Sequence, residues 1–209
     1  MSDFALSPRS GLEHLLLPGT RGALTDAPGV VVALRPDLAL AFVMARKGKA
    51  ADLRQRVQDR FGLTLPTTAQ RVEKSGGLGL DSLSFIWAGP GRWLARTPTQ
   101  TATSLEAMLR QELSGLASVV NQTDGRCVFR VSGPRSRNAL AQGVPVDIDP
   151  RVFGPGDTAL TLAGHINVHF WQLDLSPAYE LAVPRSFAAS FCEWLFAASA
   201  KYGLLVRAA

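Results

Sequence analysis

Histidine, the residue type most often found at catalytic and metal sites, is rare in this sequence, and its closest pair is predicted to lie too far apart for one metal site. The chain of 209 residues has three histidines, and His165 and His169 lie four residues apart. On a helix, that spacing would suit two ligands of one zinc ion. The surrounding segment, Gly164 to Phe170, instead alternates like a strand, which would separate the two side chains by about 13 Å. We therefore expect both histidines to be structural.

Three other segments resemble parts of known active sites, but each lacks a feature that the site would need. The glycine-rich run at 75–81 lacks the Gly-Lys-Ser ending of a phosphate-binding loop, and a strand pattern follows it. Asp147 and Asp149 flank Ile148, but an acid–base pair needs an opposing pocket, so a polar loop is expected. Ser132 is not in a Gly-x-Ser-x-Gly elbow. The sequence thus predicts no catalytic residue, no metal ligand and no cofactor-binding residue in this chain.

Charge and hydropathy exclude two classes of partner. The net charge is +5, and much of the excess lies in one segment in which Leu53, Val57 and Phe61 recur every four residues. This pattern predicts an amphipathic helix with a basic, solvated outer face. Nucleic acid is not expected as a partner because no aromatic residues interleave with the charges as base-stacking surfaces. A membrane partner is not expected because no run approaches ~20 apolar residues.

The cysteines and the N-terminus bear on the compartment. Cys127 and Cys192 are far apart in the sequence, and Leu15 to Leu17 is too short an apolar run for a signal peptide. We expect a cytoplasmic protein with two free thiols, with a single disulfide as the alternative.

The same order of secondary structure is predicted twice. Residues 1–28 are expected to be a disordered or loosely docked N-terminal extension, and residues 29–209 a single domain with two pseudo-repeated halves, about 29–115 and 116–205. Each half is expected to contain the elements β-β-α-β-β-β-α. The predicted strands are 30–35, 38–44, 69–73, 83–87, 92–96, 118–122, 126–131, 158–162, 166–173 and 179–183, and the predicted helices are 50–61, 101–113, 135–141 and 187–199. These elements indicate an α+β fold with mainly antiparallel sheets and helices packed on them.

A gapless offset of 87 residues also aligns the two halves. It places Phe42 on Phe129, Leu94 on Leu181 and Ala95 on Ala182. So few identities can arise by chance, and the shared order of elements is the better evidence for duplication.

The last predicted helix is apolar over most of its circumference. Ser186 is expected to be its N-cap, and Phe187, Phe191, Trp194 and Leu195 are expected to pack on the chain's own sheet. Phe196 lies just past the edge of this arc. Such a helix is either an inner helix between the two halves or part of a subunit interface, and the sequence leaves both open.

Four motifs in the second half resemble one family. They are Val119-Val120-Asn121-Gln122-Thr123, Phe129-Arg130-Val131-Ser132-Gly133-Pro134, the segment from Val146 to Phe153, and Val183-Pro184-Arg185-Ser186-Phe187-Ala188. Together they resemble the gamma subunit of heterotetrameric sarcosine oxidase, over roughly residues 80–205. Such subunits often carry Asp-x-Ser where this chain has Asn121-Gln122-Thr123.

The resemblance implies a fold and a role. The fold would be that of the tetrahydrofolate-binding domain of glycine-cleavage T-proteins, a duplicated β-β-α-β-β-β-α unit. The complex oxidises sarcosine with oxygen to glycine and hydrogen peroxide, and yields formaldehyde or 5,10-methylenetetrahydrofolate. FAD, FMN, NAD, zinc and tetrahydrofolate would be held by other subunits, and the partners would be the alpha, beta and delta subunits.

On this interpretation the chain is a non-catalytic subunit that supports assembly and stability. Phe196, Arg185 and Phe191 are the candidate partner-interface residues. The alternative is a stand-alone tetrahydrofolate-binding or aminomethyltransferase-like protein, which would need a central cavity with polar groups able to hold a pterin.

Overall fold

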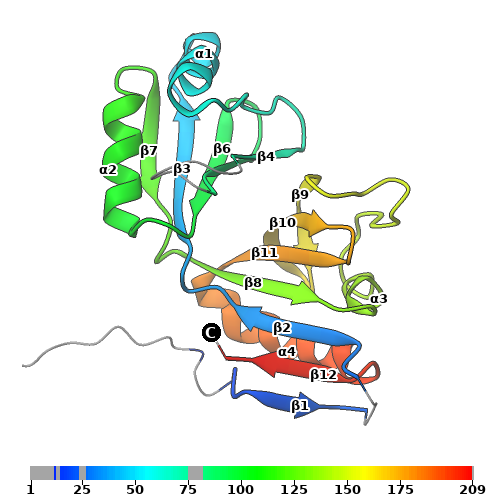
Figure 1. Ribbon diagram of the computed structural model, residues 1–209. Coiled ribbons are helices and arrows are strands. Elements are labelled where there is room, and N and C mark those ends of the chain that lie inside the picture. The colour runs from blue at the N-terminus through cyan, green and yellow to red at the C-terminus, as the bar shows by residue number, and fades with distance from the viewer. Residues whose placement is uncertain (1–11, 13–14, 24–26, 75–81, 209) are drawn as a thin grey trace, which may run out of the picture.

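Two β-sheets face one another, and each has helices on its outer face (Figure 1). The computed structural model describes residues 12, 15–23, 27–74 and 82–208, and the glycine-rich run at 75–81 lies outside them. The larger sheet has the strand order β1 (Gly19–Arg21), β12 (Leu204–Arg207), β2 (Val30–Leu34), β8 (Arg126–Ser132), β11 (Ala178–Pro184), β10 (Ile166–Asp174) and β9 (Thr158–Ala163). The smaller sheet has the order β4 (Arg71–Glu73), β5 (Ser84–Trp87), β6 (Arg92–Thr97), β3 (Ala39–Ala45) and β7 (Ala117–Asn121). The described pairings are antiparallel except for β12 with β2, which confirms the expected α+β class.

The helices follow from periodic apolar residues. In α1 (Ala50–Phe61), Leu53, Val57 and Phe61 are buried and recur at helical spacing, as the sequence predicted. α2 (Ala102–Glu112) begins where the Thr101 side chain accepts a hydrogen bond from the Ser104 amide at 3.2 Å. These two helices pack on the smaller sheet. α3 (Ser136–Leu140) and α4 (Ala188–Ala200) cover the larger one.

The predicted duplication of element order is confirmed. The first series runs β2, β3, α1, β4, β5, β6, α2, and the second runs β7, β8, α3, β9, β10, β11, α4. In space, each series also contributes one strand to the sheet of the other series, which the order of elements alone does not show. β2 of the first series lies between β12 and β8 in the larger sheet, and β7 of the second series pairs with β3 in the smaller sheet.

The residue matches at an offset of 87 are not structural equivalences. Phe42 faces the space between the two sheets, whereas its match Phe129 faces the helix-covered core of the larger sheet. Leu94 and Leu181 differ in the same way. Because one residue of slip turns a strand's side chains to the opposite face, a gapless alignment cannot superpose these strands, and the identities are coincidental.

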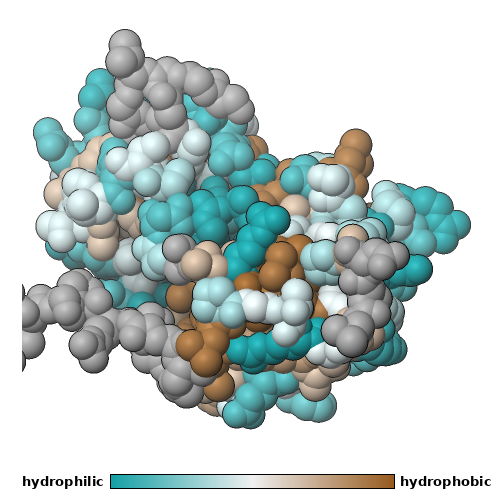
Figure 2. Space-filling model, turned by 60° about the horizontal axis from the view of Figure 1, so that its bottom comes forward, coloured by the Kyte–Doolittle hydropathy of each residue, from teal (hydrophilic) through white to brown (hydrophobic). Residues whose placement is uncertain are grey.

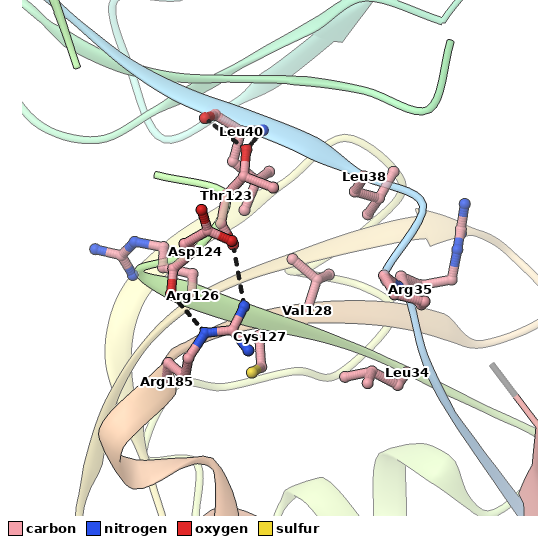
Figure 3. A pocket seen from close by; sticks show the side chains of 11 residues that line it. Leu34, Arg35, Leu38, Leu40, Thr123, Asp124, Arg126, Cys127, Val128 and Arg185 are labelled. Atoms are coloured by element: carbon pink, nitrogen blue, oxygen red, sulfur yellow. Dashed lines mark hydrogen bonds between the residues drawn. The ribbon is translucent and has the colours of Figure 1, made fainter. Parts of the chain in front are cut away.

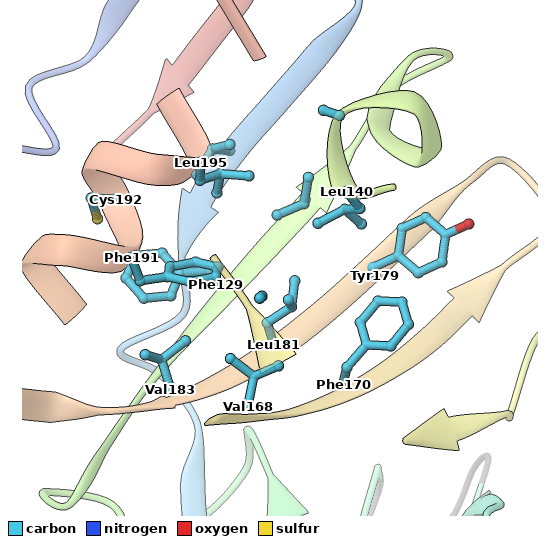
Figure 4. Packing of buried hydrophobic residues seen from close by; sticks show 14 of the residues in the cluster. Phe129, Leu140, Val168, Phe170, Tyr179, Leu181, Val183, Phe191, Cys192 and Leu195 are labelled. Carbon is cyan, nitrogen blue, oxygen red and sulfur yellow. The ribbon is translucent and has the colours of Figure 1, made fainter. Parts of the chain in front are cut away.

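Three apolar clusters form the interior. One lies between the larger sheet and α3 and α4, and Figure 4 shows its centre, where Phe129 and Phe191 have ring centroids 4.9 Å apart. The second lies between the smaller sheet and α1 and α2. The third fills the centre between the two sheets and comprises Leu38, Leu40, Ile86, Leu94, Val128, Trp171 and Ala182, with Phe42 and Leu173 against it.

Two short strands and one helix start differ from the sequence predictions. Within the stretch expected to be a loose extension, β1 pairs with β12, which was also not predicted. Both strands have only three or four residues, too few to give a clear alternation. Ser186 is not an N-cap, because a 3₁₀ turn, η1 (Arg185–Phe187), precedes α4 and no side chain caps either element.

Candidate functional site

Of the three residues expected at a partner interface, Phe191 belongs to the chain's own interior. It is completely buried against Phe129 and Trp194. Leu195 is also completely buried, as expected. Phe187 was expected to pack on the sheet, but it is 53% exposed because the 3₁₀ turn places it ahead of the helix and outside the core.

Phe196 is half-buried at the edge of the core of the larger sheet. The Arg21 guanidinium of β1 lies over its ring, 4.8 Å from the centroid, and also donates to the Leu15 carbonyl at 3.0 Å. Figure 2 looks onto the side of the molecule that carries β1 and β12, where apolar surface alternates with strongly polar surface. This chain therefore covers part of Phe196 with its own N-terminal segment.

Trp194 is held by glycines on two other segments. A Cβ atom added at Gly164 would lie 2.4 Å from Trp194 Cγ, and one added at Gly143 would lie 2.6 Å from its ring. Both distances are shorter than real contacts, so the indole packs directly on bare backbone. Trp194 is half-buried and packs against the core of the larger sheet.

Arg185, the third interface candidate, lies at the mouth of a pocket of about 260 Å³ (Figure 3). Its guanidinium donates to the main-chain carbonyls of Asp124 and Thr123. The Thr123 hydroxyl accepts from the Leu40 amide at 2.9 Å, and Asn121 Oδ1 accepts from the Thr123 amide at 2.9 Å. The Asn121-Gln122-Thr123 segment thus has a structural role in tying β7 to β3, and Arg185 fastens α4 to the same turn.

The most elaborate polar arrangement is centred on Glu180 of β11, which no sequence pattern singled out. Its carboxylate is fully buried, and Oε1 accepts hydrogen bonds from Arg35 at 3.0 Å, Arg96 at 3.1 Å and Arg130 at 3.1 Å. Trp171 Nε1 donates to Oε2 at 3.1 Å. We call these five residues the Glu180 cluster.

The Glu180 cluster joins the two sheets. Arg96 lies on β6 of the smaller sheet, whereas Glu180 lies on the larger sheet. Burial lowers the pKa of Arg96, and the nearby carboxylates of Glu180 and Glu73 oppose that shift. Arg35 also pairs with Asp37 at 2.7 Å, and this hydrogen bond raises the pKa of Arg35. These charges are paired with carboxylates of the same chain and have a structural role.

Arg126, at the start of β8, has no carboxylate partner in the described part of the chain. Its guanidinium lies over the Phe42 ring, 5.1 Å from the centroid, and its Nε is buried without a hydrogen-bond partner. Burial lowers its pKa, and no carboxylate among the described residues opposes that shift. Arg126 lines both the Arg185 pocket and a second hollow of about 450 Å³, formed with β9 and β10. We call this second hollow the strand-edge hollow.

The two neighbouring histidines are not a metal site. His165 has a φ of 68° and lies in the turn between β9 and β10, not on the strand as expected. His169 lies on β10, fully within the protein, and its Nε2 is 3.0 Å from the Trp87 carbonyl, to which it must donate. Burial lowers the pKa of His169 to about 3, so it is neutral and structural. Over the described part of the chain, no three His, Cys, Asp or Glu residues gather as metal ligands would.

The remaining candidates are also structural. Cys127 and Cys192 are both buried free thiols, and burial raises the pKa of Cys192 to about 12. Asp149 Oδ1 accepts from the Arg151 amide and guanidinium, which lowers the pKa of Asp149 to about 2. Asp147 accepts from the Asp149 amide at 2.9 Å. These aspartates thus stabilise a polar loop, as expected. No helix in the described residues is long and apolar enough to cross a membrane.

Similarity to solved structures first defines the class. The chain has the fold of a glycine cleavage system aminomethyltransferase T from Bartonella henselae, with a TM-score of 0.60 and 15% identity over 81% of this chain and 46% of that one. It is more similar to a chain of the heterotetrameric sarcosine oxidase from Corynebacterium sp. U-96 in complex with pyrrole 2-carboxylate. There the TM-score is 0.74 and the identity 21%, over 93% of this chain and 96% of that one. The chain thus has the T-protein-like fold expected from the sequence.

Sequence comparison then gives the family. Residues 47–201 match the sarcosine oxidase, gamma subunit family. The chain is 29% identical to the sarcosine oxidase subunit gamma of Corynebacterium sp. (strain P-1) over 198 residues, which are 93% of this chain and 91% of that one. The protein belongs to the sarcosine oxidase gamma subunit family.

Proposed function

We propose that this chain is the non-catalytic gamma subunit of a heterotetrameric sarcosine oxidase and supports the assembly and stability of that complex. The complex would oxidise sarcosine with oxygen to glycine and hydrogen peroxide, with formaldehyde or 5,10-methylenetetrahydrofolate as the other product. Family membership supports this proposal, as does the near full-length match to a gamma subunit. The partners would be the alpha, beta and delta subunits.

The observation that carries the non-catalytic role is the filled centre between the sheets. A ligand held between the sheets would need that space, but the third apolar cluster and the fully hydrogen-bonded Glu180 carboxylate occupy it. The adjoining Arg185 pocket, at about 260 Å³, is smaller than the roughly 300–1,000 Å³ typical of small-molecule sites. The strand-edge hollow, at about 450 Å³, is within that range, but it is lined mostly by β9 and β10 at the edge of the larger sheet and not by the centre between the sheets. This arrangement favours a structural subunit over a tetrahydrofolate-binding protein.

The cofactors of the complex would lie on its other subunits. FAD, FMN, NAD, zinc and tetrahydrofolate would be bound by the alpha, beta and delta chains, and catalysis would take place there. We place the complex in the cytoplasm, where the two buried free thiols would stay reduced.

Co-expression with the large oxidase subunits tests the proposal. We expect a tagged form of this chain to capture them in stoichiometric amounts, and the captured complex to oxidise sarcosine with release of hydrogen peroxide. The chain expressed alone should be colourless and inactive. Stoichiometric flavin in the isolated chain, or failure to capture any oxidase subunit, would contradict the proposal. So would calorimetric binding of tetrahydrofolate with a micromolar Kd or tighter, about −8 kcal/mol, which would favour the alternative.

A further inference from the structure

Arg126 differs from the other arginines that lie between the two sheets. Arg35, Arg96 and Arg130 each pair with the Glu180 carboxylate. Arg126 is half-buried against the Phe42 ring, and no described carboxylate pairs with it. A partly desolvated cation without a counter-ion is unfavourable, and an incoming carboxylate would relieve this.

The hollow beside Arg126 offers apolar surface as well as charge. Leu160 and Leu162 project from β9 and are 53% and 39% exposed. β9 is the last strand of the larger sheet, so no further described strand covers its outer edge. Asn167, directly opposite Leu162 on β10, lines the same hollow and adds an amide.

The smaller sheet has an exposed apolar residue beside the ring that Arg126 covers. Val120 is paired in register with Phe42 and is 43% exposed. Directly opposed residues of antiparallel strands project from the same face of their sheet, so Val120 lies on the face that carries the Phe42 ring under Arg126. Arg126 thus shares the hollow with two exposed leucines of the larger sheet, and an exposed valine of the smaller sheet is paired with the phenylalanine whose ring it covers.

Two neighbouring titratable groups, His169 and Arg185, have hydrogen-bond partners of their own. His169 also lines the hollow, but it is neutral and its Nε2 is engaged by the Trp87 carbonyl. Arg185 lies in the adjoining pocket and donates to main-chain carbonyls. Among the residues that the structure describes, Arg126 is therefore the cation at this opening without a hydrogen-bond acceptor.

We propose that Arg126 and the strand-edge hollow form a docking point for an aspartate or glutamate side chain presented by another subunit of the oxidase. This proposal rests on the proposed function. An acidic side chain of the partner would pair with the Arg126 charge. Apolar residues beside it on the same partner segment would cover the exposed leucines and valine. A small free carboxylate would satisfy the charge but leave the exposed apolar residues uncovered, so we commit to a protein partner.

The experiment co-expresses the other oxidase subunits with tagged wild-type or variant chain and compares how much complex each tagged chain captures over a dilution series, which gives the relative affinity. Arg126→Glu should weaken assembly at least about 30-fold, because a like charge would face the partner's carboxylate. Arg126→Met should weaken it less, and Arg126→Lys should retain part of the affinity. Arg46→Glu is the matched control, since Arg46 is exposed and lies next to the basic helix; it should bind like the wild type. Far-UV circular dichroism and melting temperature verify that each variant is folded.

The possible outcomes separate this proposal from the function on which it rests. If wild type and Arg126→Glu bind with equal affinity, the docking point is refuted while the gamma-subunit function stands. If the wild type does not bind at all, both fail. A third arm titrates the isolated chain with acetate and benzoate. Micromolar binding that Arg126→Met abolishes would make the hollow a small-molecule site and overturn the docking proposal.

Discussion

Glu180 and Arg126 both lie between the two sheets, and their surroundings differ in one decisive respect. Glu180 is fully buried and accepts hydrogen bonds from three arginines and a tryptophan. Arg126 is half-buried and has an aromatic ring in place of a carboxylate partner. A buried charge whose partners all come from the same chain holds that chain together. A partly buried charge without a partner in its own chain indicates where a group of another molecule can bind.

Removing the Glu180 charge should have the largest effect. Glu180→Gln keeps the shape but leaves three arginines without their shared counter-charge, so we expect a loss of about 3–5 kcal/mol in the free energy of unfolding. Chemical denaturation measures it. The matched control, Glu193→Gln on the exposed side of α4, should change stability by less than about 0.5 kcal/mol. If the two substitutions lower the free energy of unfolding equally, the Glu180 cluster contributes no more to stability than an exposed charge.

Lowering the pH should destabilise the fold through His169, which lines the strand-edge hollow. The pKa of folded His169 is about 3 against an ordinary 6.5, so between these values the unfolded chain binds a proton that the folded chain does not. Stability from this residue is therefore present above about pH 6.5 and is lost as the pH falls, by about 2–3 kcal/mol at pH 4.5. Urea unfolding at pH 7 and pH 4.5 should show a smaller decrease in His169→Gln than in the wild type. An identical decrease in both would contradict the neutral, buried assignment.

On α4, Trp194 packs against the core of the larger sheet, whereas Phe196 lies at the edge of that core. Trp194→Ala should cost about 2–3 kcal/mol, less than the roughly 3–5 kcal/mol of a fully buried tryptophan, because Trp194 is half-buried. Phe196→Glu should cost less than about 1 kcal/mol, because the new carboxylate can pair with the overlying Arg21. It should nevertheless weaken capture by the large oxidase subunits. Thermal unfolding and a capture assay test the pair, and equal destabilisation would make Phe196 part of the chain's own core.

The smallest expected effect on stability is at Arg126. Arg126→Met keeps most of the apolar stem and removes a charge that has no carboxylate partner among the described residues. The free energy of unfolding should therefore stay within about 0.5 kcal/mol of the wild type or increase slightly. A loss of more than about 2 kcal/mol on denaturation would mean that Arg126 stabilises the fold and would place it in the same class as Glu180.

The elements were predictable because local patterns define them. The four-residue recurrence of Leu53, Val57 and Phe61 is visible in the sequence, and α1 occupies the predicted residues 50–61. The Glu180 cluster was not predictable. In Tyr179-Glu180-Leu181, the polar residue between two apolar ones is typical of a side chain facing solvent. Only the second sheet, packed against that face, makes the position an interior one.

The interface candidates show the same limit. Periodicity placed Phe191 and Leu195 on one apolar arc of the last helix, and both are buried. Phe187 was assigned to the arc too, but the 3₁₀ turn after Pro184 moves it out. The unpaired state of Arg126 depends on which residues of β3 and β10 come near it, and a single sequence does not give that information.

The exchange of β2 and β7 between the sheets has a consequence for the order in which the chain can fold during synthesis. All strands of the smaller sheet lie before residue 122, so that sheet can form early. The larger sheet cannot, because β2 needs β8 on one side and residues 204–207 on the other. Until those residues leave the ribosome, β1 has no partner strand and β2 has an open edge, which is a template for association with another chain. The edge of β2 should therefore stay open until β12 has left the ribosome.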